Sequence, residues 1–447
     1  MRITSRLATA AAVLAFAVPM FRPVQAREAF RIASVRPPEL DSPRAQQREN
    51  QVIVQFRADT GDRDVARVSR DAGAARVRRS SFATDRYLMT LDAGFTPQEA
   101  MQRMASAPEV EYVEKNGAVH AFFRPNDTGF PVQWNFRMLD AERTWDIQKG
   151  DASVVVAVLD TGIAYEDFGR FRKAPDFGGT TFVPGFDFIN GDSHPNDDNF
   201  HGTHVASTIA EATDNSEGVT GFAFRCALMP VKVLDENGDG SFFDVAEGID
   251  FARERGAHVI NLSLGGEGNS ATVRTAIDKA VAANITVVAA AGNDGRGTVS
   301  FPAALPNVIA VGAVDGRKLR APYSNFGAEI DLMAPGGNNQ RDDTGANGVP
   351  DGRPDGILQQ TMDPDSAERG IYDDFGYFFV SGTSQATPHV VALAALLYRQ
   401  GITKPEAIKA AMEQTAEDLG GAGRDDTFGH GLIRPSLALK GLGLNTK

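Results

Sequence analysis

Short apolar runs separated by polar segments mark the first part of the chain. Runs at 52–56, 87–91 and 110–114 predict strands, and helical spacing after a threonine predicts a helix over 96–105. Together they have a strand–helix–strand pattern. The pattern predicts a small α+β domain.

A second pattern follows, in which continuous apolar runs alternate with amphipathic segments. The runs predict strands at 153–159, 228–234, 258–264, 285–290 and 308–314. A helix is expected to begin near His201, and others to cover 244–255, 270–283 and 384–398. Continuous apolar strands are typical of a parallel sheet buried on both faces. The alternation predicts a doubly wound α/β fold, whose mostly parallel sheet is flanked by helices and binds ligands at the carboxyl ends of its strands.

The N-terminus has the pattern of a secretory signal peptide. Arg2 and Arg6 precede an apolar run over 7–20, and residues 24–26 offer small side chains for cleavage. The run is short for a helix that spans a bilayer. We therefore expect residues 1–26 to be removed, leaving a secreted protein with no membrane anchor.

Residue composition and a predicted linker divide the rest of the chain into two domains. Residues 27–50 are rich in Arg, Glu, Pro and Gln and predict a flexible arm, whereas 116–133 indicate a linker. We therefore expect one domain over 27–126, including the arm, and a second over 127–447. The apolar fraction of 42%, with 45 glycines and 23 prolines, is typical of a globular protein with many loops.

Charge and cysteine content narrow the function classes. Residues 1–126 carry a net charge of +5 and residues 127–447 one of −18. An acidic body argues against nucleic acid as a partner and favours solubility or cation binding. The basic segment could dock on the acidic one. A single cysteine, Cys226, excludes an intramolecular disulfide and is expected to be a small buried side chain.

Three short motifs carry the candidate chemistry. They are Asp160-Thr161-Gly162, His201-Gly202-Thr203-His204 and the run from Gly382 to His389, which contains Ser384. A serine hydroxyl is a weak nucleophile near neutral pH, so it needs a base to take its proton and a carboxylate to orient that base. The motifs supply one of each, in the order Asp, His, Ser that is typical of subtilisin.

From about residue 134 to about 433, the chain resembles the subtilisin-like serine peptidases. The resemblance implies that Ser384 is the nucleophile, His201 the general base and Asp160 the residue that orients it. Asn293, within Ala291-Gly292-Asn293-Asp294-Gly295, resembles the asparagine that stabilises the oxyanion. The resemblance also implies that His204 and His389 are structural histidines. A zinc site is not expected, because His-Gly-Thr-His lacks the glutamate and the spacing of one.

The same resemblance implies where the substrate binds. An extended peptide is expected to pair with the backbone of two glycine-containing segments, and side-chain pockets are expected to select among sequences. Phe242 should line the pocket for the fourth residue before the cut, Ser300 should lie at the base of the primary pocket, and Asp294 at its rim. The substrate-binding residues implied are Gly238, Gly240, Phe242, Ser263, Leu264, Gly265 and Ser300.

Structural calcium is the implied cofactor. The oxygen-rich loop over 187–196 resembles a calcium loop of thermitase-like members, with Asp187, Asp192 and Asn196 at ligand positions, although Asn190 stands where an aspartate is usual. The alternative is a solvated acidic loop without a metal. Asn215 matches a ligand of a second family site, but the aspartate expected after Asp160-Thr161-Gly162 is displaced by an insertion.

Two further segments have spaced carboxylates. The segment 235–240 mimics the opening of an EF-hand but lacks the twelfth-position glutamate. The stretch 342–355, with Asn347 and Asp351, could bind calcium or form an exposed loop.

These patterns predict a secreted, monomeric serine endopeptidase acting on protein or peptide substrates. By resemblance, the 27–126 domain is a propeptide that assists folding, inhibits the enzyme within the same chain and is removed by self-cleavage. Two alternatives keep the scaffold but change the outcome. One is an inactive protein that binds peptides or calcium, and the other is a peptide ligase that uses the same acyl-enzyme.

Overall fold

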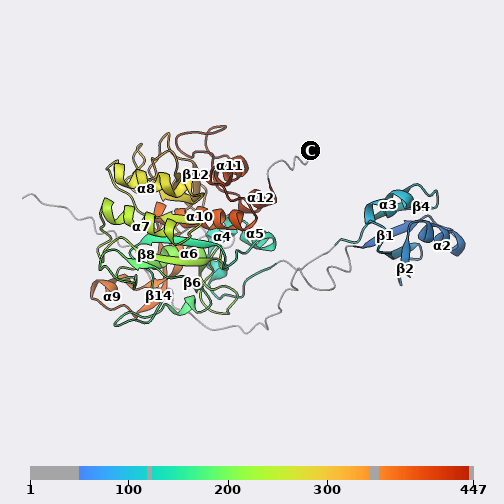
Figure 1. Ribbon diagram of the computed structural model, residues 1–447, viewed down its shortest axis with the longest axis horizontal. Coiled ribbons are helices and arrows are strands. Elements are labelled where there is room, and N and C mark those ends of the chain that lie inside the picture. Colours follow the sequence, from blue (N-terminus) through green and yellow to red (C-terminus); the bar gives the residue numbers. More distant parts are fainter. Residues whose placement is uncertain (1–49, 118–122, 343–351, 442–447) are drawn as a thin grey trace, which may run out of the picture. The chain divides into compact units, whose positions relative to one another are not determined.

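The computed structural model describes residues 50–117, 123–342 and 352–441, which form two compact units, 50–117 and 123–441 (Figure 1). The predicted signal peptide and, apart from Asn50, the predicted arm lie outside the described residues. Asn347 and Asp351 also lie outside them. Among the described residues, no helix combines the length and the apolar content needed to cross a bilayer.

The smaller unit is a four-stranded antiparallel sheet packed against two helices. Its strands lie in the order β2-β3-β1-β4. The elements are β1 (Gln51–Phe56), α2 (Asp62–Asp71), β2 (Ala74–Arg79), β3 (Arg86–Leu91), α3 (Pro97–Ala105) and β4 (Val110–Lys115). The predicted strands and helix are present, and α3 begins with a capping box between Thr96 and Glu99. All strand pairs are antiparallel, so the unit contains no parallel strand–helix–strand crossover.

The sequence did not predict α2 and β2, because charged residues dominate both segments. Helix α2 buries only Val65, Val68 and Ser69. Strand β2 lies at the edge of the sheet and exposes Arg76, Arg78 and Arg79, so its side chains carry no alternating apolar signal.

The larger unit is built on a parallel sheet, as the apolar runs predicted. Its order is β12-β11-β10-β9-β5-β8-β6, with β7 also paired to β8. The strands are β5 (Val155–Asp160), β6 (Thr181–Phe182), β7 (Phe186–Asp187), β8 (Ala227–Lys232), β9 (Val259–Leu262), β10 (Thr286–Ala290), β11 (Ile309–Val314) and β12 (Leu332–Pro335). From β8 through β12 every strand residue is buried, which accounts for the continuous apolar pattern.

Helices flank this sheet (Figure 1). They are α4 (Trp134–Met138), α5 (Ala141–Ile147), α6 (His201–Ala210), α7 (Phe242–Glu254), α8 (Ala271–Ala282), α9 (Pro364–Glu368), α10 (Thr383–Arg399), α11 (Pro405–Thr415) and α12 (Pro435–Lys440). Helix α10 is buried from Thr383 to Leu397 and packs against β9, β10, β11 and β12. Short 3₁₀ helices cover Phe130–Val132 and Pro175–Phe177.

A β-hairpin that the sequence did not predict packs against α6. It consists of β13 (Ile357–Met362) and β14 (Phe375–Val380), and α9 lies in the connection between them. All of β13 is buried although it contains Gln359, Gln360 and Thr361. These polar residues hid the strand, because they interrupt the apolar run that a buried strand normally has.

The parallel sheet places three chemically important segments at one edge. Asp160 is the last residue of β5, Ser263 directly follows β9, and Asn293 lies three residues after β10. Because β5, β9 and β10 run parallel, their carboxyl ends meet at the same edge of the sheet.

The central helix should dominate the stability of the larger unit. Leu393 is fully buried in α10. Leu393→Ala removes its packing and leaves a cavity, so we expect a loss of about 2–5 kcal/mol in the free energy of unfolding. Urea unfolding measures the change. Glu247→Gln, on the exposed face of α7, should differ by less than about 0.5 kcal/mol; equal losses in both variants would contradict this assignment of the core.

Candidate active site

Asp160 and His201 form a close pair at the carboxyl edge of the sheet. Asp160 Oδ1 lies 2.8 Å from His201 Nδ1. The carboxylate is fully buried and also accepts the backbone N–H of Thr161 at 2.7 Å. The imidazole begins α6 and its side chain is 23% exposed, so it can reach both the buried carboxylate and the cleft.

The glycine after His201 is required by close packing. A β-carbon on Gly202 would overlap the carbonyl oxygen of Gly162 and lie 3.2 Å from Cβ of Asp160. The Gly202 N–H donates to the Thr161 hydroxyl at 2.9 Å, and this hydroxyl donates to Asp197 at 2.8 Å. The backbones of the Asp160-Thr161-Gly162 and His201-Gly202 segments therefore pack directly against each other.

The carboxylate changes the acidity of the imidazole. Burial alone would lower the pKa of His201, but the charge and hydrogen bond of Asp160, with the charge of Asp197, raise it above its ordinary value of 6.5. A base with a raised pKa holds a proton more firmly once it has taken one. The pair can therefore accept a proton from a neighbouring hydroxyl and stabilise the resulting imidazolium.

Ser384 lies at the start of α10 and pairs with Ser263. Its hydroxyl donates to the carbonyl oxygen of Ser263 at 3.0 Å, and the hydroxyl of Ser263 donates to the carbonyl oxygen of Ser384 at 2.9 Å. Ser384 is 9% exposed. Its hydroxyl must rotate away from Ser263 before it can bond to another acceptor.

Asn293 is held by the turn that precedes Ser384. Its Oδ1 accepts the backbone N–H of Thr383 at 2.8 Å and the Thr383 hydroxyl at 2.9 Å. Because both bonds occupy the oxygen, the Nδ2 amide remains as the donor of this side chain. A β-carbon on Gly382 would lie 3.6 Å from that Nδ2, which places the amide beside the start of the serine helix.

His204 and His389 are structural, as the sequence predicted. His204 Nε2 contacts the carbonyl oxygens of Ile357 at 3.1 Å and Phe378 at 3.3 Å in the β13–β14 hairpin. His389 Nδ1 donates to the carbonyl oxygen of Gln385 at 2.9 Å. Burial lowers the pKa of His204 to about 3 and that of His389 to about 4. Both stay neutral near neutral pH.

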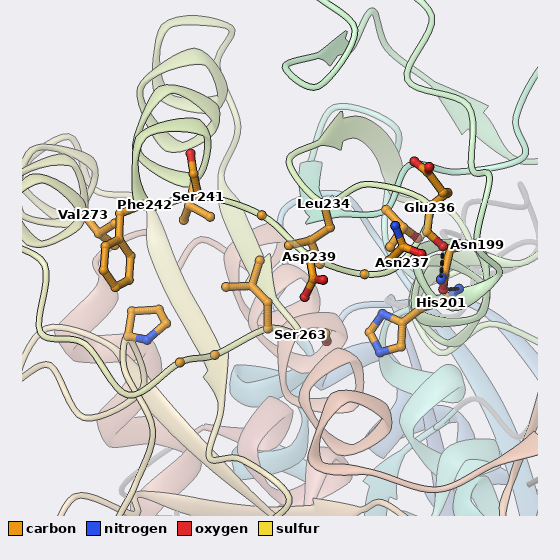
Figure 2. Close-up of a pocket in the computed structure, with 18 of the residues that line it drawn as sticks. Asn199, His201, Leu234, Glu236, Asn237, Asp239, Ser241, Phe242, Ser263 and Val273 are labelled. Carbon is orange, nitrogen blue, oxygen red and sulfur yellow. Dashed lines mark hydrogen bonds between the residues drawn. The ribbon is translucent and has the colours of Figure 1, made fainter. Parts of the chain in front are cut away.

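A cleft of about 830 Å³ borders the imidazole (Figure 2). Figure 2 shows Phe242 and Val273 together at one end of the cleft and His201 at the other. Of the substrate-binding residues implied by the sequence, Gly238, Gly240, Phe242, Ser263, Leu264 and Gly265 line it. Ser300 lies behind this wall, since a β-carbon on Gly265 would be 3.2 Å from Cβ of Ser300.

The segment 235–240 is an ordered turn beside the cleft. The Asp235 carboxylate accepts the backbone N–H groups of Asn237 at 2.9 Å and Asp239 at 3.0 Å. This carboxylate closes the turn on itself.

In the first predicted calcium loop, 187–196, carboxylates accept hydrogen bonds from backbone N–H groups of the same loop. Asp187 accepts the N–H groups of Ile189 and Asn190, and Asp192 accepts that of His194. Asn196 donates to Glu166 at 3.1 Å, while its Oδ1 is buried without a hydrogen-bond partner among the described residues. One unpaired carbonyl oxygen is therefore available to a cation.

A stronger candidate cation site surrounds Asn215. Its amide donates to Asp176 Oδ1 at 2.6 Å, and Asp127 Oδ1 nearby is buried without a partner among the described residues. Burial raises the pKa of Asp127 to about 7, with Asp176 contributing, and burial also raises that of Asp176. Two buried carboxylates that form no ion pair within the described residues fit a bound calcium ion.

The sequence missed Asp127 and Asp176. Asp176 comes sixteen positions after Asp160, beyond the insertion, and Asp127 lies in the predicted linker. Within the described part of the chain, no group of three His, Cys, Asp or Glu side chains could hold a metal by itself. Calcium at this place would need amide or backbone oxygens as further ligands.

Phe200, which directly precedes His201, has an unusual backbone. Its φ of 133° and ψ of −26° lie in a region that bulky residues rarely adopt. Such a conformation costs about 1–3 kcal/mol and persists only where surrounding contacts enforce it. Its carbonyl oxygen accepts the Thr361 hydroxyl at 2.5 Å, and its N–H donates to Asp197 at 3.2 Å.

Comparisons with known proteins agree with this geometry. Residues 151–431 match the Subtilase family (Peptidase_S8), and residues 35–116 match the Fervidolysin N-terminal prodomain. The chain belongs to the subtilase family. It is a subtilisin-like serine protease with an N-terminal prodomain, an organisation consistent with a zymogen.

Individual relatives span most of this subtilase. The Thermophilic serine proteinase of Bacillus sp. (strain AK1) is 35% identical over 382 residues, which are 85% of each chain. Thermitase of Thermoactinomyces vulgaris is 35% identical over 67% of this chain and 94% of its own. A solved protease structure from Pseudoalteromonas arctica PAMC 21717 has a TM-score of 0.62 at 31% identity, covering 71% of this chain and 98% of that one.

The acidity of the imidazole can be measured directly. Asp160→Asn removes the carboxylate that raises the pKa of His201 and leaves the burial that lowers it. We therefore expect the pKa to lie above 6.5 in the parent and to fall in the variant, so that less of the imidazole is protonated at a given pH. NMR titration of His201 in a Ser384→Ala background tests this. An unchanged pKa would contradict the coupling.

Proposed function

We propose that this protein is a secreted endopeptidase that cleaves proteins or peptides through an acyl-enzyme on Ser384. The observation that carries the proposal is the 2.8 Å contact between Asp160 and His201, at the edge where Ser263 meets Ser384. Asp160 keeps the imidazole proton on Nδ1, so that Nε2 is free to accept the Ser384 proton.

Substrate binding comes first in the proposed cycle. An extended peptide pairs with the backbone beside Ser263, Leu264 and Gly265 on one side and Gly238 and Gly240 on the other. The aromatic ring of Phe242 borders the apolar end of the cleft. We propose broad specificity with an apolar preference, because Phe242 and Ser300 are uncharged and the carboxylate predicted at the rim, Asp294, is exposed.

The acylation step then follows from the side chains at the carboxyl edge. Ser384 Oγ bonds to the scissile carbonyl carbon while His201 takes its proton, and the carbonyl oxygen becomes an oxyanion. The Asn293 amide and the Ser384 backbone N–H donate to that oxyanion. The C–N bond then breaks, and His201 gives its proton to the leaving amine. Water, activated by the same imidazole, releases the acid product and restores Ser384.

Calcium is proposed as a structural cofactor held by Asp127, Asp176 and Asn215, with the loop of Asp187, Asp192 and Asn196 as a second candidate. When bound, it supplies the positive charge that offsets carboxylates buried without a cation. Its role is to stabilise the loops on either side of α6, away from the reacting atoms.

The prodomain and the N-terminus complete the proposal. The domain over 27–126 acts as a folding aid and intramolecular inhibitor that the enzyme itself removes from the 127–447 domain, and the leader at 1–26 directs secretion. The fervidolysin-like match over residues 35–116 supports the first part, and the charge and apolar pattern of the leader supports the second. We propose that the mature enzyme is a monomer without a membrane anchor.

The nucleophile is tested by substitution. Ser384→Ala should abolish peptide hydrolysis and leave the precursor unprocessed, because the variant lacks the hydroxyl that is proposed to attack the scissile carbonyl carbon. Ser153→Ala, at the opposite end of β5, is the matched control and should mature normally. A Ser384→Ala protein that processed itself at the normal rate when purified alone would overturn the proposal. Mass spectrometry of the secreted chain reports both outcomes.

The calcium proposal is tested by melting temperature. At a concentration of about 100 times its dissociation constant, a ligand stabilises the folded state by about 2.7 kcal/mol. In a Ser384→Ala background, we therefore expect calcium to raise the melting temperature above its value in chelator. Asp176→Asn should remove most of that shift, and the exposed Asp365→Asn should keep it. A shift lost in Asp192→Asn but kept in Asp176→Asn would move the site to the other loop.

A further inference from the structure

The strained residue before His201 is braced by two loops that lie far apart in the sequence. The Phe200 side chain packs in an apolar cluster, here called the Phe200 cluster. Its members are Phe171, Phe200, Met362, Ala367, Tyr372 and Phe375. One loop, 163–174, follows the Asp160 motif, and the other, 363–374, connects β13 to β14. Met362, Ala367 and Tyr372 are buried, so the cluster is well packed. It borders the cleft through Phe200 and Ala367.

The two loops are fastened to each other by aromatic contacts. The rings of Phe171 and Tyr372 stack at 4.9 Å with an interplanar angle of 15°. The Arg170 guanidinium lies 4.6 Å from the centre of the Tyr372 ring. Tyr372 is 6% exposed and does not line the cleft, whereas Phe200 and Ala367 do. Tyr372 can therefore be changed without removing a group that borders the substrate.

We propose that the Phe200 cluster is a positioning device for His201, with Phe200 and Tyr372 as its positioning residues. The inference rests on the proposed role of His201 as the base. A φ of 133° is unfavourable for phenylalanine, so releasing the side chain would leave the strain to be held by the backbone bonds to Asp197 and Thr361 and would favour relaxation. His201 is the next residue and the first of α6, and would move with that backbone.

The neighbouring contacts determine which part of α6 would move. The Gly202 N–H donates to Thr161, and the Thr203 N–H and hydroxyl donate to Asp197 at 2.9 and 2.6 Å, so both residues have anchors besides Phe200. The His204 N–H donates to the Phe200 carbonyl oxygen at 3.1 Å. The His201 N–H has a weaker tie, to Asn199 at 3.2 Å. Relaxation at Phe200 is therefore concentrated on the imidazole, and a misplacement of about 1 Å at a reacting group can cost about 100-fold in rate.

The test first removes Tyr372 from the Phe200 cluster and then replaces Phe200 with glycine, which relieves the backbone strain. Tyr372→Ala should lower kcat by about 10- to 100-fold with little change in KM. It should also shift the acid limb of the pH profile of kcat/KM to lower pH, because the imidazole loses part of its contact with Asp160. Glycine adopts positive φ without strain. Phe200→Gly in the Tyr372→Ala background should therefore restore much of the lost kcat and return the acid limb toward the parent.

Matched controls separate positioning from general stability. Tyr372→Phe keeps the stacked ring and should retain the parent kcat. Ile371→Ala changes the exposed neighbour of Tyr372, outside the cluster, and should behave like the parent. A merely structural cluster would instead give a Tyr372→Ala protein with a lower melting temperature, the parent kcat and the parent acid limb, and that result would overturn the inference. Losses that simply add in the Tyr372→Ala/Phe200→Gly double variant would also overturn it.

A His201→Ala variant distinguishes failure of the inference from failure of the proposed function. If His201→Ala keeps the parent kcat, the proposed catalytic role itself is wrong. If His201→Ala is inactive while Tyr372→Ala retains the parent kcat and acid limb, only the brace is refuted.

Discussion

A single buried contact, between the Asp160 carboxylate and the His201 imidazole, constrains the architecture around it. A carboxylate without exposure to water is costly unless charge and hydrogen bonds compensate. Here the compensation comes from the imidazole and the Thr161 N–H. The contact places Asp160 at the end of β5 and His201 at the start of α6. It also requires glycine at 202, because no side chain fits between the two segments. The hydrophobic sheet supplies the rigid frame in which such a contact can persist.

Much of this arrangement could be predicted because local sequence and global fold agree. Continuous apolar runs marked the strands of the parallel sheet, and the short glycine-containing motifs marked where strands end and helices begin. The sequence predicted a parallel sheet that binds ligands at the carboxyl ends of its strands, and Asp160, Ser263 and Asn293 lie at that edge. The structure brings Asp160 to His201 and Ser263 to Ser384, contacts that join residues 41 and 121 positions apart.

What could not be predicted depends on tertiary context. Strand β13 is buried yet contains two glutamines and a threonine. The backbone carbonyls of Ile357 and Gln360 in this strand accept hydrogen bonds from His204 and Ser207 on α6. Asp176 was hidden by an insertion of unknown length, and Asp127 by its place in a linker. Phe200 gave a weaker signal: a bulky residue directly before the His201-Gly202 pair. Its positive φ and the distant loops that hold it become visible in the three-dimensional structure.

The most direct test of the central claim is to identify the hydroxyl that reacts with a fluorophosphonate, by peptide mass mapping. Ser263 lines the cleft and is hydrogen-bonded to Ser384, so the reagent has a second serine hydroxyl with which it could react. The account predicts one adduct, on Ser384, that forms more slowly as the pH falls through the pKa of His201. No adduct, or an adduct on Ser263, would contradict it.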